Sequence, residues 1–143
     1  MTKNQGRAEK YLMQIKKADK EITEMILKIS FLRYKASGMG AIRYDKDSVQ
    51  TSPQDMMCEA ITEVVCLEEK MTSRHRELMN ARRRTEEIIQ LWGDNQAKFI
   101  DIYYLNDGKM SDVAEQIKCS DRTAYRIKLE ALERFSKQMQ DFV

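Results

Sequence analysis

The chain has 143 residues, which suits one domain or two small ones, and it contains only five glycines and one proline. With 42% apolar and 34% charged residues, this scarcity of helix breakers predicts an all-α protein with long helices and excludes a β-sandwich or a β-barrel. The formal net charge is only +2, so binding of an anionic partner requires local clustering of basic residues.

The side chains that carry most enzyme chemistry are scarce. The chain has one histidine, no glycine-rich phosphate loop, and three cysteines (58, 66 and 119) without metal-ligand spacing. We therefore expect no enzyme, no catalytic residues, no metal site and no cofactor, with the cysteines acting as small apolar packing residues. No apolar run approaches the roughly 20 residues of a membrane span, so we expect a cytoplasmic protein that binds no membrane.

The first element is predicted over about residues 4–36 as a single helix. Apolar side chains recur there every seven residues, the spacing that lets one helix pack along another. At about 1.5 Å per residue this helix would extend roughly 50 Å. One heptad position holds Ala8, Ile15, Ile22 and Ile29. The second holds Tyr11, Ala18, Met25 and Leu32.

The second element is predicted to start at Ser52 and Pro53, an N-cap residue followed by a proline suited to the first helical position. Gly93 ends it after about forty residues. Two long amphipathic helices joined by a polar linker predict an antiparallel hairpin over residues 1–92, which must self-associate or bind a partner to cover its apolar stripe. We expect a homo-oligomer, with a dimer favoured, formed through Ile15, Ile22, Ile29, Val64 and Met71.

The third block, residues 93–143, is predicted as a separate module that would keep its helical structure when cut near Asp94. Asp94 caps a first helix, and the turn at residues 106–108 leads to a short helix that includes Val113 and Ile117. Ser120 caps a longer third helix. This order of helix, turn, short helix, tight turn and longer helix is typical of a helix-turn-helix module.

The outward face of the last helix indicates DNA binding. Apolar Val113, Ile117, Ala124 and Ile127 fit the core positions of the module, and residues 118–128 contain four basic residues against one acidic residue. Such a local basic face suits a DNA-reading helix. The residues predicted to contact base edges are Arg122, Tyr125 and Arg126, and those predicted to contact phosphates are Lys118, Ser120, Thr123 and Lys128.

The segment from Met110 to Lys128 resembles the region-four helix-turn-helix of bacterial sigma factors. Residues 11–19 (YLMQIKKAD) and 49–55 (VQTSPQD), followed by Leu67-Glu68, resemble the phage and prophage sigma-region-four-like regulators of Gram-positive bacteria, which are kin to late-operon activators of the ArpU and RinA type. The resemblance covers nearly the whole chain. It also places Lys118 at a turn position where the sigma pattern has glycine and where φ is positive.

This resemblance implies a sequence-specific transcriptional regulator that binds double-stranded DNA, activates phage genes and contacts host RNA polymerase. Two alternatives come from other classes. Small terminase subunits in phage DNA packaging also combine a helix-turn-helix with an oligomerising helical pair, although their DNA-binding module usually comes first. A coiled-coil adaptor whose C-terminal module binds protein is the other. A closed ring of eight or more subunits would favour packaging, and a dimer would favour regulation.

Overall fold

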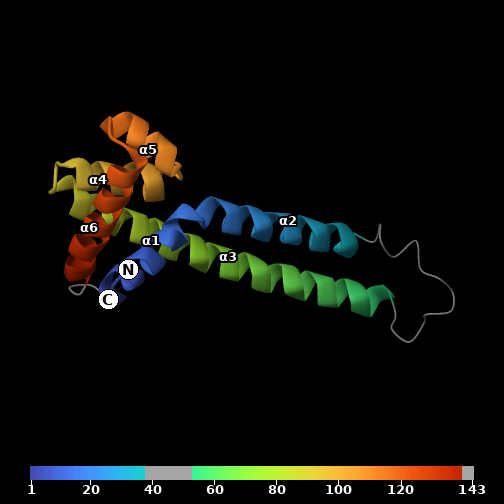
Figure 1. Ribbon diagram of the computed structural model, residues 1–143. Coiled ribbons are helices and arrows are strands. Elements are labelled where there is room, and N and C mark those ends of the chain that lie inside the picture. The colour runs from blue at the N-terminus through green and yellow to red at the C-terminus, as the bar shows by residue number, and fades with distance from the viewer. Residues whose placement is uncertain (38–52, 140–143) are drawn as a thin grey trace. The chain divides into compact units, whose positions relative to one another are not determined.

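The computed structural model describes residues 1–37 and 53–139, and all regular structure in these two ranges is helical, in agreement with the all-α prediction (Figure 1). No helix there is long and apolar enough to cross a bilayer. The α-helices are α1 (Lys3–Lys16), α2 (Ala18–Ala36), α3 (Pro53–Gln90), α4 (Asn95–Ile100), α5 (Met110–Ile117) and α6 (Asp121–Met139), and a π-helical segment, Asp101–Leu105, follows α4.

The chain forms two compact units whose limits differ from the predicted division at residue 92. One unit combines residues 1–18 with 77–143, and the other consists of residues 19–76. Helix α3 contributes to both units. The N-terminal helix therefore belongs to the same unit as α5 and α6, whereas the sequence assigned it to a separate hairpin.

The single helix predicted over residues 4–36 is interrupted at Lys17, which has φ −91° and ψ 3°. No glycine or proline marks this position, and the heptad pattern continues across it. The physical reason lies in tertiary packing, because α1 and α2 bury their apolar residues in different units. The predicted cap Ser52 lies outside the described residues, and α3 begins at Pro53.

The larger unit has the main core. Helix α1 begins with a capping box, in which the Thr2 hydroxyl accepts from the Gln5 N–H and the Gln5 side chain accepts from the Thr2 N–H. The same helix then buries Ala8 and Leu12 completely, with Ile15 5% exposed, against the C-terminal helices. The largest fully buried residues of this core are Tyr104, Phe99, Phe135, Leu12, Ile100, Leu132 and Val113.

The start of the C-terminal helices follows the predicted signals. After α3 ends, Gly93 adopts φ +62°, a conformation that favours glycine. Asp94 then caps α4, accepting from the Ala97 N–H at 3.1 Å, and pairs with Arg134 at 2.8 Å. Although partial burial tends to raise the pKa of Asp94, these bonds hold it below its ordinary value.

The π-helical segment was not predicted. It presents Tyr103 and Tyr104 in succession, with ring centroids 4.8 Å apart, and the Asn106 N–H closes it by donating to the Asp101 carbonyl. The turn that follows requires Gly108, because a Cβ there would lie 2.7 Å from the Ile102 carbonyl oxygen. Tyr104 is fully buried, and burial raises the pKa of its hydroxyl, which therefore stays neutral.

The smaller unit contains α2 and the first part of α3, which lie side by side in opposite directions (Figure 1). Ion pairs join the two helices at both ends: the Arg74 Nε is 2.8 Å from a Glu21 carboxylate oxygen, and Arg33 pairs with Glu68. The apolar contact between them consists of buried Ile29, Leu32 and Val64 with half-buried Leu67 and Met71.

Candidate nucleic-acid interface

The turn between α5 and α6 has a positive φ at Lys118, the position where the resemblance to the sigma pattern implies one. Lys118 adopts φ 62° and ψ 53°, in the left-handed region, and the Cys119 N–H donates to the Ala114 carbonyl at 2.9 Å. Ser120 then caps α6, because its hydroxyl oxygen accepts from the Thr123 N–H at 3.2 Å. The Ser120 hydroxyl also donates to the Thr123 hydroxyl at 3.0 Å. This turn is three residues long and leads directly into the exposed first turns of α6.

One side of α6 is buried and fixes which residues face outward. The buried residues fall along one side of the helix, about one turn apart singly or in adjacent pairs: Ala124, Ile127, Lys128, Ala131, Leu132, Phe135, Ser136 and Met139. Val113 and Ala114 of α5 pack in the same core.

The predicted base-contacting residues lie together on the opposite side. Arg122 and Arg126 are exposed, one helical turn apart, and Tyr125 between them is 50% exposed. The Arg126 side chain is 72% exposed, and its only described ion pair is to Glu130, with the Nε 4.0 Å from a carboxylate oxygen. The structure thus brings these three residues to one accessible surface, which we call the α6 outer face. Exposed Lys118 lies in the turn that precedes it.

Lys128 does not join this surface, which corrects its predicted role as a phosphate contact. Its side chain is only 10% exposed, and its Nζ lies 3.2 Å from a Glu9 carboxylate oxygen on α1. The ammonium also lies 5.5 Å from the Tyr103 ring centroid and 5.8 Å from that of Tyr125. Because it falls on the buried side of α6, Lys128 joins α6 to α1 and cannot meet DNA without leaving the core.

A second lysine, which the sequence analysis missed, joins α1 to the turn before α5. The Lys16 Nζ donates to the carbonyls of Tyr103 at 2.9 Å and Gly108 at 2.7 Å. It also pairs with Asp107 at 3.1 Å and lies 3.9 Å from the Tyr103 ring centroid. Lys16 and Glu9 therefore hold the elements on both sides of α5. Neither residue belongs to a sequence motif, so their roles become apparent only from the position of α1 in the structure.

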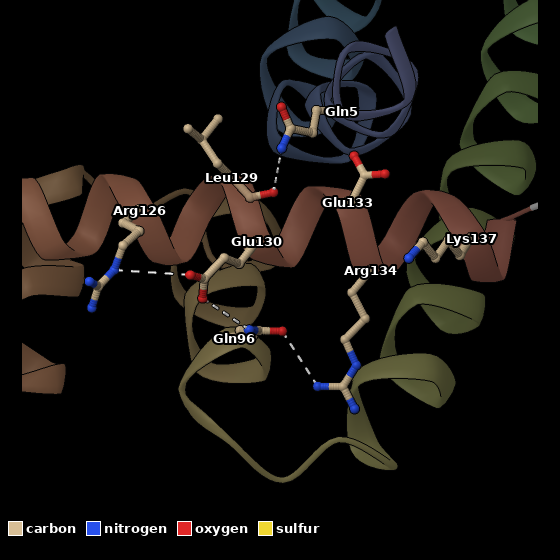
Figure 2. A pocket seen from close by; sticks show the side chains of 8 residues that line it. All are labelled: Gln5, Gln96, Arg126, Leu129, Glu130, Glu133, Arg134 and Lys137. Atoms are coloured by element: carbon tan, nitrogen blue, oxygen red, sulfur yellow. Dashed lines mark hydrogen bonds and ion pairs between the residues drawn. The ribbon is translucent and has the colours of Figure 1, made fainter. Parts of the chain in front are cut away.

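An open groove of about 480 Å³ borders Arg126 along α6 (Figure 2). Three of its charged residues are already engaged with neighbours: Glu130 lies between Arg126 and Gln96, and Arg134 reaches toward Gln96 (Figure 2). At the α1 side, the Gln5 amide donates to the Leu129 carbonyl at 3.0 Å. These bonds give the groove a structural role in holding α1 and α4 against α6.

The five residues predicted to form an oligomer interface are used inside the chain. Ile15 is buried in the larger core, whereas Ile29 and Val64 are buried together in the smaller unit. Met71 packs beside them, and Ile22 is half-buried. The stripe is therefore covered by intrachain packing.

The cysteines also depart from the prediction, since Cys58 and Cys66 are exposed and only Cys119 packs against the core.

Potential metal ligands do not gather anywhere in the two described ranges, since no three His, Cys, Asp or Glu side chains come together there.

Comparison of the chain with protein-family models, with curated proteins and with solved structures gives no match. The sequence and the geometry of the α6 outer face are therefore the features of this chain that point to a function.

The left-handed conformation of Lys118 leads to a stability prediction. Replacing it by glycine removes the strain of a Cβ in that region, so Lys118→Gly should stabilise the chain by about 1 kcal/mol. Lys118→Ala is the matched control, because it removes the same charge and keeps the strain. Thermal unfolding followed by circular dichroism measures both. A glycine variant no more stable than the alanine variant would contradict the assigned turn.

Proposed function

We propose that this chain is a sequence-specific DNA-binding transcriptional regulator in which α5, the turn and α6 form a helix-turn-helix. The observation that carries the proposal is the α6 outer face: two arginines and a tyrosine are exposed on the first turns of a helix whose other side is packed in a core. An arginine in this position can donate two hydrogen bonds to a guanine edge in the major groove.

The roles of the individual residues follow from their positions. Arg122, Tyr125 and Arg126 read base edges, and Lys118 with the N-terminal end of α6 binds phosphate. Ser120 and Thr123 add hydroxyl groups at the same end of the helix. Lys128 has no DNA contact in this proposal because it is buried and paired with Glu9.

The biological setting rests on the resemblance to sigma-region-four-like regulators of phages and prophages. On that basis we propose that the chain activates phage genes in a bacterial cytoplasm, in contact with host RNA polymerase. The turn at Lys118 and the cap at Ser120 support the helix-turn-helix part of this resemblance.

The test of the proposal is Arg126→Ala. Losing one bidentate contact costs about 1–3 kcal/mol of base discrimination, so binding to a preferred duplex should fall about tenfold or more, with little change on scrambled DNA. The fold should persist, because an exposed ion pair such as that with Glu130 contributes little. Arg83→Ala is the control, since Arg83 is an exposed arginine of α3. If Arg126→Ala keeps the specific-to-scrambled ratio of the wild type, the α6 outer face does not read bases.

A further inference from the structure

Helix α2 carries an exposed apolar stripe on the side away from α3. Its members are Leu27, Phe31 and Tyr34, which are 64%, 58% and 50% exposed. Their spacing of four and then three residues is that of a packing seam between two helices. The buried residues Ile29 and Leu32, which contact α3, lie on the opposite side of α2. We call this stripe the α2 seam.

The smaller unit needs additional packing. Within its described residues, only Ile29, Leu32 and Val64 are buried apolar side chains, with Leu67 and Met71 packed beside them. A two-helix arrangement with so small a core is marginal in water, and helical pairs of this kind normally gain stability by association. Three large apolar side chains in one row are the natural site for that association.

The charges along α2 favour one kind of partner. Glu21 and Arg33 are already paired with Arg74 and Glu68 of α3. The remaining charges still divide along the helix, with Asp19, Glu24 and one lysine in its first part and Lys28 and Lys35 in its second. A parallel copy of α2 would place like charges together, whereas an antiparallel copy places the acidic part against the basic part. We propose that a second copy of this chain packs antiparallel along the α2 seam and forms a dimer.

The seam also fixes the register. An antiparallel pair centred between Leu27 and Phe31 sets Leu27 of each copy against Phe31 of the other. Glu24 and Lys35 flank the seam on the same side of the helix, so this register brings Glu24 near Lys35 of the second copy. The Lys35 Nζ already lies 4.8 Å from the Phe31 ring centroid, at the edge of the seam. This interface differs from the stripe predicted from the sequence and does not depend on DNA binding.

The test is the mass of the full chain by light scattering across a range of concentrations. The wild type should have twice the mass of one chain, and Leu27→Glu should raise the dimer Kd about tenfold or more. Met79→Glu is the matched control, because Met79 is an exposed apolar residue of α3 outside the seam. Its mass should equal that of the wild type.

Charge reversal tests the antiparallel register without altering apolar side chains. Glu24→Lys and Lys35→Glu should each weaken the dimer, and the double reversal should restore it. The inference is overturned by a wild type that stays monomeric, by a ring of eight or more subunits, or by a dimer insensitive to both Leu27→Glu and the reversals. DNA binding by the same variants is measured separately, so a failure of the seam is distinguishable from a failure of the α6 outer face.

Discussion

A fragment that begins at Asp94 is expected to be unfolded, although the sequence alone suggested that it would keep its helices. The fragment lacks α1, which supplies Ala8, Leu12 and Ile15 to the core around α6. Removing three buried apolar side chains leaves the inner sides of α6 and the π-helical segment exposed to water. Far-ultraviolet circular dichroism of the fragment, compared with that of the full chain, measures this directly.

A point variant tests the same dependence within the full chain. Leu12 is completely buried, so Leu12→Ala should lower the free energy of unfolding by about 2–5 kcal/mol. The control is Leu91→Ala, because Leu91 is 87% exposed and its removal should change stability by less than about 0.5 kcal/mol. Equal melting curves for the two variants, or a cooperatively folded Asp94 fragment, would show that α1 is dispensable.

Lys128→Met is expected to destabilise the chain without changing how DNA binding depends on salt. The substitution leaves Glu9, whose side chain is 23% exposed, without its partner, and losing one partner of such a partly buried pair costs about 1–3 kcal/mol. Because the Lys128 ammonium is paired with Glu9 and its side chain is nearly buried, the slope of log affinity against log salt should match that of the wild type. Chemical denaturation and a salt titration on duplex DNA measure the two quantities.

A double variant distinguishes the loss of the Glu9–Lys128 ion pair from a loss of packing. Replacing both charges, as in Glu9→Leu with Lys128→Met, leaves no unpaired charge and should recover much of the lost stability. The prediction would be contradicted if Lys128→Met left the stability unchanged and made the slope of log affinity against log salt shallower by about one, the value for one lost phosphate contact.

Local signals in the sequence predicted the C-terminal helices well. Gly93 and Asp94 mark the start of α4, and Ser120 marks the start of α6, because positive φ and capping depend on the residue itself. The resemblance to the sigma pattern implied a positive φ at Lys118, and Lys118 adopts a positive φ in the structure.

Tertiary packing decided what the sequence did not predict. The heptad pattern of residues 4–36 is compatible with one helix or two, and the contacts of α1 with α6 and with the π-helical segment distinguish α1 from α2. The burial of Lys128 had a signal, because it falls four residues after Ala124 and four before Leu132, on the apolar side of α6. Its charge suggested a surface residue, yet Glu9 on a distant segment makes burial possible.

Selection of binding sites from random duplex DNA tests the central claim most directly, namely that the α6 outer face reads base sequence. The 143-residue chain should enrich one recurring motif. A variant with Arg122→Ala and Arg126→Ala should bind DNA without enriching that motif, because the phosphate contacts remain and both bidentate arginine contacts to bases are lost. Failure of the wild type to enrich any motif, or enrichment of the same motif by the double variant, would contradict the claim.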